Sequence, residues 1–577
     1  MNSEHSPVLV PSLSANDTQL HALVDYLFMN GAFDHKAYHD RVLELLAHQE
    51  PMDTQHSPET WAHHLTNRGL GFDARLQMAM VVAKLTGLMT IPTIVLRVEL
   101  KKAIATKDIS RLREIHASTT AIVLRPKLKA FFGTTGEQIC LVQAANSACT
   151  ALQSWTAALP RSEPAQDTPA KVGRSFLLML SWIPANAETG AHLKQLASYS
   201  QALALACQAG GEGPVRIRVM FTYENMTFWL AQNFQSYSTP GANVIKDTIT
   251  EALDGLDVDF DVIHVLPPHF DTTQDWITAT LDKIDAFNPD CVIRWYGFYA
   301  SNFTAPVIHK KYPMLGIQFN ANNPVDRFSH ILLNQGDLKE THKNDPRWRN
   351  HLIPLEVLKR RLTFTRAECD LPENCFAIAT TLSGTRLERA ILVLTPDKVE
   401  QLLSVFERHS NLKWLWIGIT DPESLRNHHP ELRRLIDTDR IRCIPFSDDL
   451  RALYQHCDLY VHLPSMFGGG MGVAMAIVEH RAVLAHAGTD PCNFLAPDTI
   501  VEGWDVFLQA LDTLILSSPE RDRIAQEQKA WLDEKHGLAA VGQEVLGYVS
   551  QARQIFKDTQ DTQTQDGLFP NRAIKTR

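Results

Sequence analysis

The first part of the chain has the hydrophobic spacing of helices. Apolar residues recur at every third or fourth position, whereas the strict alternation typical of strands is scarce. The clearest stretches lie at 18–31, 73–89, 108–132 and 137–159. We therefore predict an all-helical domain over residues 1–160. A polar, proline-containing segment follows at 160–173 and has the composition of a linker.

After the linker, short runs rich in Val and Ile alternate with helical stretches. Such alternation is typical of α/β domains with mostly parallel sheets. Two series are present, and we predict two doubly wound, Rossmann-like halves at 174–370 and 371–557, with a flexible tail at 558–577. The predicted strands lie at 174–182, 214–223, 257–268, 289–298 and 313–320 in the first half, and at 375–383, 413–419, 441–446, 458–464 and 482–488 in the second.

Length and composition agree with a large globular protein. A chain of 577 residues is too long for one core, and 45% apolar with 21% charged residues is ordinary for such proteins. The net charge of −10 gives no sign of a nucleic-acid surface. We find no apolar run long enough to span a membrane and no signal-peptide pattern at the start of the chain.

Cysteine and histidine give little sign of disulfide or metal chemistry. The nine Cys are odd in number and widely spaced, which favours free thiols in a reducing compartment, so we predict a cytoplasmic protein. The 24 His are scattered, and neither HExxH nor CxxC occurs, so we predict no metal site.

A glycine cluster stands at the end of one predicted strand of the second half. The stretch "LPSMFGGGMGVAMAIVEH" (463–480) reads as a strand end, a loop at 465–472 and a helix. Glycines let backbone N–H groups approach an anion, and a helix N-terminus adds partial positive charge, so a diphosphate would fit there. A strained turn, or close packing on a neighbouring element, is the other interpretation. The spacing is neither GxGxxG nor that of a P-loop.

The segment that contains this loop, "IRCIPF…HAGTD" (441–490), resembles the donor half of a glycosyltransferase of the B fold. The order of a helical domain before two α/β halves is similar to that of the adhesin N-glycosyltransferases and their O-GlcNAc transferase relatives. Weaker similarities lie in "WYGFYASNFTAP" and "YPMLGIQFNANNP", within 295–324. The resemblance covers roughly residues 215–530.

The resemblance implies a function. It implies transfer of a hexose from a nucleotide-sugar, with UDP as the nucleotide, without a metal ion, with inversion and with no cofactor beyond the donor. The large helical domain favours a polypeptide acceptor. A glycan or small-molecule acceptor stays open, as do an epimerase or phosphorylase of the same fold and a catalytically degenerate B-fold protein that only binds.

The resemblance also implies a set of donor-binding residues. Relatives carry a carboxylate for the ribose on the helix after the glycine loop; here Met475 occupies that position, and Glu479, one turn further, is the substitute. The predicted donor-binding residues are Ser383, Gly384, Thr385, Gly418, Pro445, Phe446, Phe467, Gly468, Gly469, Gly470, Met471, Gly472 and Glu479.

Two residues are predicted to carry the chemistry. Arg386, with Arg389 behind it, stands where relatives use a basic residue against the diphosphate. Glu224 follows a strand of the first half and is the predicted base for the acceptor, although a carboxylate there would also suit the start of a helix. Asn225, Asn320 and Asn322 are predicted to bind the acceptor, with ordinary turn chemistry as the alternative.

Overall fold

A computed structural model describes most of the chain. The described residues are 54–67, 72–123, 135–159, 174–181, 191–224, 243–266, 272–296, 304–318, 326–335, 342, 344–355, 362–382, 386–392, 394–445, 447, 449–464, 466 and 468–565. None of the helices within these ranges combines the length and the apolar character that crossing a membrane requires.

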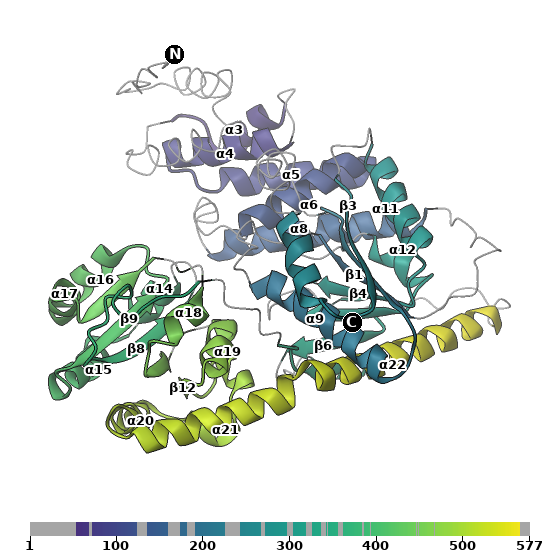
Figure 1. The fold of residues 1–577 in the computed structure, drawn as a ribbon. Coiled ribbons are helices and arrows are strands. Elements are labelled where there is room, and N and C mark those ends of the chain that lie inside the picture. The colour runs from purple at the N-terminus through teal and green to yellow at the C-terminus, as the bar shows by residue number, and fades with distance from the viewer. Residues whose placement is uncertain are drawn as a thin grey trace, which may run out of the picture.

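The first described region is helical, as predicted. Its first helix is fixed locally, because the Ser57 side chain accepts a hydrogen bond from the Thr60 N–H and a proline stands at the first helical position. The five helices lie over the first half (Figure 1). They are α3 (Pro58–Thr66), α4 (Phe72–Thr86), α5 (Ile91–Thr106), α6 (Ile109–Val123) and α8 (Thr135–Ala157).

This helical region does not have a core of its own throughout. One cluster of buried side chains joins Phe72, Leu112 and Leu152 of the helices to Leu177 and Met179 of the first sheet. The boundary predicted at residue 160 therefore separates helices from the first strand along the sequence, but the residues on its two sides share one hydrophobic core. Removing the helices would expose the apolar face of the first sheet to water.

The first sheet has seven parallel strands in the order β3-β2-β1-β4-β5-β6-β7. Its central strands are buried almost throughout, which explains their unbroken apolar runs. The strands are β1 (Arg174–Leu180), β2 (Val215–Phe221), β3 (Val258–His264), β4 (Cys291–Tyr296), β5 (Met314–Gln318), β6 (Ile331–Gln335) and β7 (Trp348–His351), with helices α9 (Ala191–Ala209), α11 (Thr273–Phe287) and α12 (Ala305–His309) between them. The sequence patterns missed the short strands β6 and β7.

The second sheet has six parallel strands in the order β10-β9-β8-β11-β12-β13. They are β8 (Phe376–Thr381), β9 (Leu412–Ile417), β10 (Ile441–Ile444), β11 (Leu459–His462), β12 (Ala482–His486) and β13 (Ile500–Val501). The helices between them are α14 (Arg386–Leu392), α15 (Pro396–Arg408), α16 (Pro422–His428), α17 (Pro430–Asp437), α18 (Leu450–Tyr454) and α19 (Gly470–Val478), with short 3-10 turns η3 (Asp490–Phe494) and η4 (Pro497–Thr499). α16 and α17 are two separate helices, because Pro430 starts a new one.

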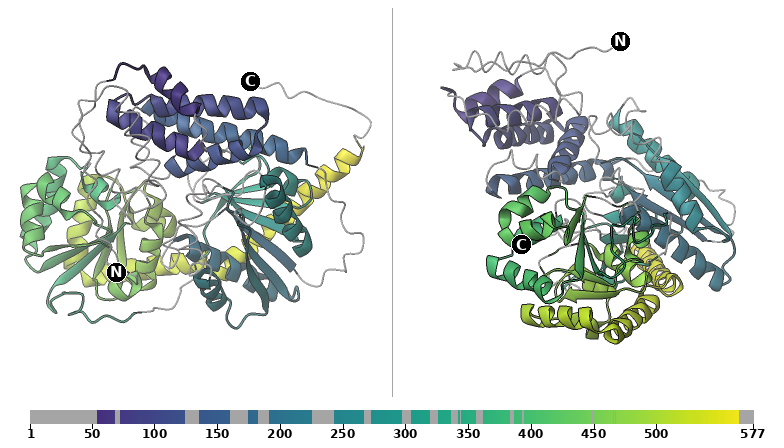
Figure 2. Two further views of the ribbon diagram at one scale, coloured as in Figure 1. Left: turned by 90° about the horizontal axis from the view of Figure 1, so that it is seen from above. Right: turned by 60° about the vertical axis from the view of Figure 1, so that its left-hand side comes forward.

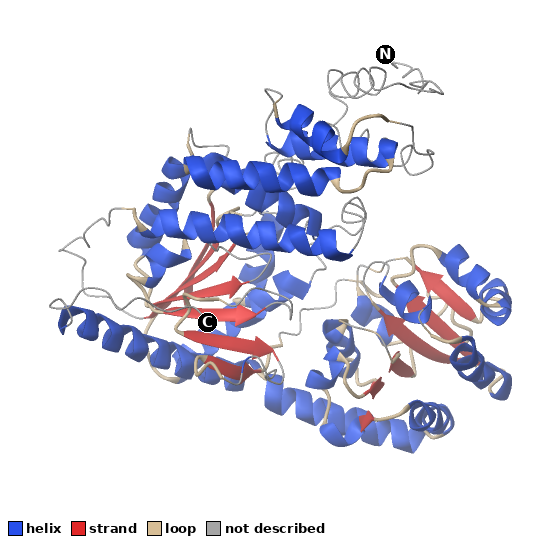
Figure 3. Cartoon of the chain, turned by 180° about the vertical axis from the view of Figure 1, so that it is seen from behind, coloured by secondary structure: helices blue, strands red, loops and turns tan. Residues whose placement is uncertain are grey.

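Three helices close the chain: α20 (Trp504–Leu516), α21 (Ser518–His536) and α22 (Leu538–Gln565). α21 packs under the second half, and α22 runs back along the first half (Figures 1 and 3). Residues 558–565, predicted to begin a flexible tail, belong to α22, and Gln560 Nε2 donates to the Lys310 carbonyl at 3.0 Å.

The two sheets lie side by side with the helical region along one side of them (Figure 2). Both halves have the Rossmann order, in which the third, second and first strands are followed by the fourth, fifth and sixth. The predicted fold class, two doubly wound halves preceded by a helical region, is confirmed.

The far end of α22 rests on a pair of stacked histidines. Phe556 meets the His330 ring edge-on, and His330 stacks on His309 with 4.6 Å between ring centroids. His330 is buried, and its Nδ1 accepts a hydrogen bond from the Met314 N–H at 3.0 Å. Burial, followed by the neighbouring His309, lowers the pKa of His330 to about 4.

This lowered pKa predicts acid sensitivity. The folded chain holds His330 neutral, whereas the unfolded chain takes up a proton on this histidine below about pH 6.5. The folded state therefore keeps its full stability with respect to His330 above about pH 6.5, and loses it progressively as the pH falls towards about 4. The full loss is at most about 3 kcal/mol. We expect His330→Asn, whose side-chain oxygen can replace Nδ1 as acceptor, to reduce the acid-induced loss in chemical denaturation. Asparagine in place of the exposed His480 is the control, and an equal effect of both would contradict the prediction.

Candidate functional site

The glycine loop lies where the second sheet changes direction. β8 and β11 are neighbours at the centre of the sheet, and the chain leaves them for α14 and α19, respectively. In doubly wound sheets the strand order reverses between two such strands, which opens a crevice at their carboxyl ends where ligands bind. The predicted loop at 465–472 follows β11 at this point.

Hydrogen bonds fix the end of β8 beside the loop. Thr380 is buried, and its hydroxyl accepts from Trp414 Nε1 at 2.9 Å. The Tyr454 hydroxyl donates to Thr381 Oγ1 at 2.7 Å, and the Tyr460 hydroxyl donates to the Thr381 carbonyl at 3.1 Å. Both threonines therefore anchor strands and helices around the crevice.

The loop turns through two left-handed glycines into α19. Gly468 and Gly469 have φ values of 90° and 87°, a region that residues with a Cβ rarely occupy. Gly469 is the N-cap of α19, and no side chain of the described residues caps the helix there. The N–H groups of a first helical turn have no partner within the helix. This helix start can therefore donate backbone hydrogen bonds to an anion.

Gly470 is required for a different reason. A Cβ on Gly470 would lie 2.6 Å from Cε2 of Phe494, which is too close for any side chain unless the ring moves. The glycine run thus has a structural explanation at each position: backbone conformation at the first two, and close packing at the third. The anion-binding interpretation rests on the N–H groups of the first turn of α19, which have no partner within the helix, rather than on the lack of side chains.

Phe494 connects the glycine loop to the junction of the two halves. Its ring stacks on His536 with 4.7 Å between centroids. The His536 ring lies between two backbone carbonyls, with Nδ1 2.8 Å from the oxygen of Ile353 and Nε2 2.9 Å from that of Asn493. Ile353 follows the first sheet and Asn493 belongs to the second half, so His536 joins the two halves next to Phe494.

The other predicted donor-binding residues next to the loop have mixed surroundings. Gly418 has φ 105°, and its Cβ would lie 1.8 Å from the Leu382 carbonyl oxygen, so the approach of two strand ends demands glycine. Pro445 is exposed at the end of β10. Gly472 lies under two tyrosine hydroxyls, which a Cβ would approach to 3.5 and 3.6 Å.

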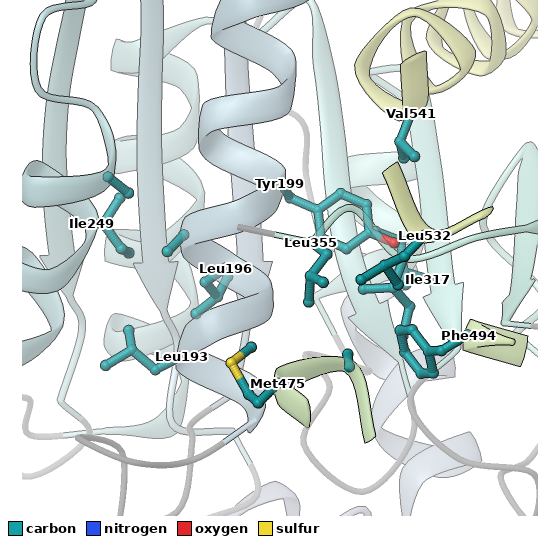
Figure 4. Packing of buried hydrophobic residues seen from close by; sticks show 14 of the residues in the cluster. Leu193, Leu196, Tyr199, Ile249, Ile317, Leu355, Met475, Phe494, Leu532 and Val541 are labelled. Atoms are coloured by element: carbon teal, nitrogen blue, oxygen red, sulfur yellow. The ribbon is translucent and has the colours of Figure 1, made fainter. Parts of the chain in front are cut away.

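The two residues discussed for ribose binding are both engaged elsewhere. Met475 is only 3% exposed and packs in the core with Leu193 of α9 (Figure 4). Glu479 is the C-cap of α19 and pairs with Arg451 of α18, with 2.6 Å between Oε1 and Nε. At a rise of about 1.5 Å per residue, Glu479 lies roughly 13 Å along the helix from Gly470. Its role in ribose binding stays a prediction without support from this geometry.

Glu224 is deeply buried beneath the helical region. It is 0% exposed and accepts a hydrogen bond from the Thr304 hydroxyl. The pKa of Cys149, in α8, is raised to about 12, mainly by burial and next by the Glu224 carboxylate. Arg294 acts in the opposite direction. Glu224 therefore faces α8. Its role as a base stays a prediction, and it requires an acceptor that reaches this buried position.

A buried ion pair lies in the same half, and sequence reasoning missed it. Arg294 Nε lies 3.6 Å from Asp326 Oδ2, and both side chains are buried. Burial alone would raise the pKa of Asp326, but Arg294, the Ser329 hydroxyl and backbone N–H groups together lower it. Gly316 lies against this pair: a Cβ added there would be 2.7 Å from Ser329 Oγ, so a larger residue at 316 would displace the serine. An arginine inside the apolar run "CVIRWY" was the signal that could have revealed the pair.

Several predicted site residues cannot be placed. Arg386 begins α14, but its side chain is outside the described part of the chain. Met471 is placed: it lies in the first turn of α19 and is half-buried. The remaining predicted residues fall outside the described ranges: Ser383, Gly384, Thr385, Phe446, Phe467, Asn225, Asn320 and Asn322.

Comparison with known proteins finds similarity in structure only. No family model and no curated protein matches the chain. The Thermobaculum terrenum O-GlcNAc transferase aligns over 94% of this chain and 99% of its own, at 10% identity and a TM-score of 0.46. A Rickettsia africae glycosyltransferase covers 66% of this chain and 98% of its own (12% identity, TM-score 0.44), and Anabaena HepE, solved with UDP and glucose, covers 66% and 99% (11% identity, TM-score 0.43).

At such identities and TM-scores the likeness does not extend beyond the fold. Three features of this chain decide the fold: the strand orders of its sheets, its division into two halves, and the closing helix that returns from the second half to the first. This is a glycosyltransferase B fold. The resemblance inferred from the sequence is confirmed at that level, and the start of α19 is the candidate donor site of such a fold.

Proposed function

We propose that the chain is a glycosyltransferase that moves a sugar from a UDP-sugar to a polypeptide side chain. The observation that carries the proposal is the α19 N-terminus at the switch point between β8 and β11, which no side chain within the described ranges caps. Its first-turn N–H groups and its helix dipole suit a diphosphate. UDP as the nucleotide and a hexose as the sugar rest on the family resemblance.

The same elements support metal-independent chemistry. Negative charge grows on the departing diphosphate, so groups that bind it more strongly in the transition state raise the rate. The α19 amides and Arg386, which begins α14 at the neighbouring strand end, are the proposed groups. Inversion at the anomeric carbon, and location in the cytoplasm, complete the proposal on the sequence arguments above.

The acceptor is proposed to enter from the side of the first half and the helical region. The packing of α4, α6 and α8 on the first sheet makes these helices part of one body with that half. Glu224 is the proposed base, and Asn225, Asn320 and Asn322 the proposed acceptor contacts.

A degenerate B-fold protein that binds without transferring is the second candidate. Met475 is buried where relatives carry a ribose-binding carboxylate, and Glu479 is held by Arg451. Both observations favour weaker donor binding than relatives achieve.

A thermal-shift panel of UDP, ADP, GDP and their sugars, followed by a transfer assay, tests the proposal. At a hundred times its dissociation constant a ligand adds about 2.7 kcal/mol to stability, which gives a measurable shift. We expect uridine nucleotides to raise the melting temperature most, and the matching UDP-sugar to be consumed with a polypeptide present. Binding without consumption would favour the degenerate protein, and no shift with any nucleotide would exclude the proposed UDP-sugar transferase.

A further inference from the structure

The outward face of α5 combines positive charge with exposed aliphatic side chains. Arg97, Lys101 and Lys102 are all exposed. Arg97 and Lys101 are about one helical turn apart and lie one above the other, and Lys102, the next residue, widens this face. Val98 and Ile104 lie among them and are each 45% exposed. From Arg97 to Ile104 the face is about 10 Å long at the helical rise of about 1.5 Å per residue.

No acid of α5 balances these cations. Glu99, the one acidic residue in the helix, is buried and pairs with Arg75, and its second oxygen lies 3.9 Å from Arg111 Nε. The next acid along the chain, Asp108, is exposed, but its carboxylate accepts the Arg111 N–H at 2.9 Å at the start of α6. The outward face is therefore positive, because its acid is used on the inward face.

Exposed apolar side chains continue onto α8, and positive charge is in excess over the whole helical region. Arg97 Nη2 reaches Cys140 Sγ at 2.9 Å, which brings the neighbouring Ile139, 51% exposed, to the edge of the face. Residues 54–159 hold 12 Lys and Arg against 6 Asp and Glu, although the whole chain has a net charge of −10. This stretch of the sequence is therefore positive, opposite in sign to the chain as a whole.

We propose that this face of α5 docks an acidic segment of the polypeptide acceptor, with apolar residues between its acids. The inference rests on the proposed function, and it adds the chemical class of the acceptor. Opposite charge speeds encounter and selects partners, and the aliphatic residues, with the methylene stems of the lysines, supply apolar contact. A single-stranded nucleic acid fits less well, because α5 has no aromatic side chain on which bases could stack.

Binding of a short fluorescent peptide of alternating Glu and Leu to the full chain tests the proposal without any sugar transfer. We expect the double variant Lys101→Glu/Lys102→Glu to lose at least about tenfold in affinity by fluorescence anisotropy at low salt. Raising NaCl from about 0.05 to 0.5 M should weaken binding by the native chain and change the variant little, because salt screens exposed charges. A peptide of alternating Glu and Ser should bind more weakly than the Glu-Leu peptide.

The control variant, Lys283→Glu/Lys557→Glu, makes the same charge change at exposed lysines of α11 and α22. Equal loss in both double variants, or no binding by the native chain, would overturn the proposal. Tighter binding of an oligonucleotide than of the peptide, lost in the α5 variant, would assign the face to nucleic acid and overturn it as well. If no UDP-sugar is consumed with any acceptor but the peptide binds through α5, the proposed function fails and the docking face stands.

Discussion

Replacing Gly418 with alanine is expected to destabilise the second half by about 2–6 kcal/mol. The residue has φ 105°, and its Cβ would lie 1.8 Å from the carbonyl oxygen of Leu382, a backbone atom that cannot rotate away. Left-handed strain and overpacking each cost about 1–3 kcal/mol, and here both apply. Gly418 also donates to the Ile444 carbonyl at 2.7 Å, so its displacement would disturb the ends of β8, β9 and β10 together.

The measurement has to report on one half, because a chain of several domains need not unfold in a single step. Hydrogen exchange of peptides from β9, which ends at Ile417 just before Gly418, meets this requirement. Gly488→Ala is the matched control, since Gly488 also has a positive φ, 79°, but its Cβ would meet nothing within 4 Å. We expect the control to cost about 1 kcal/mol from strain alone. Similar exchange in the two variants would mean that Leu382 moves aside easily.

Replacing Arg386 with alanine is expected to lower turnover by about 100- to 1,000-fold, the range found when one donor to a developing oxyanion is removed. Arg386 begins α14 directly after the β8 loop, at the same sheet edge from which α19 starts. Its partner in the proposal is the diphosphate, whose charge grows as the sugar leaves. The affinity for UDP should therefore fall less than the turnover.

This prediction is measured with the UDP-sugar that performs best in the thermal-shift panel, as sugar transfer or UDP release, and with calorimetry for UDP. Arg389→Ala, three residues further along α14, removes the same charge from the same helix and serves as the control. Turnover in Arg386→Ala equal to that of the native chain would exclude Arg386 from the mechanism. The positive charge would then have to come from the α19 amides or from Arg389.

The candidate site was predicted in outline and not in detail. The position of a glycine loop between a strand and a helix can be read from local pattern, and α19 begins within that loop. The surroundings of single residues could not be read in this way. Met475, Glu479 and Glu224 were weighed by their place in the chain, whereas their neighbours Leu193, Arg451 and Thr304 are remote in sequence.

The sequence by itself determined the order of the elements. Helical spacing before residue 160, and Val- and Ile-rich runs alternating with helices after it, follow from which faces of each element are buried, and that pattern is local. Short elements escaped it: β7, of four residues, is too brief for its periodicity to be recognised.

Only the tertiary structure decided what the glycines and buried charges do. Phe494 lies 24 positions after Gly470 in the sequence and Leu382 lies 36 positions before Gly418, yet each comes close enough to forbid a side chain. The return of α22 to the first half, the core shared by the helical region and β1, and the burial of Glu224 beneath α8 are likewise contacts between distant segments. Such contacts arise when apolar faces pack against each other, and a single sequence does not specify which faces will meet.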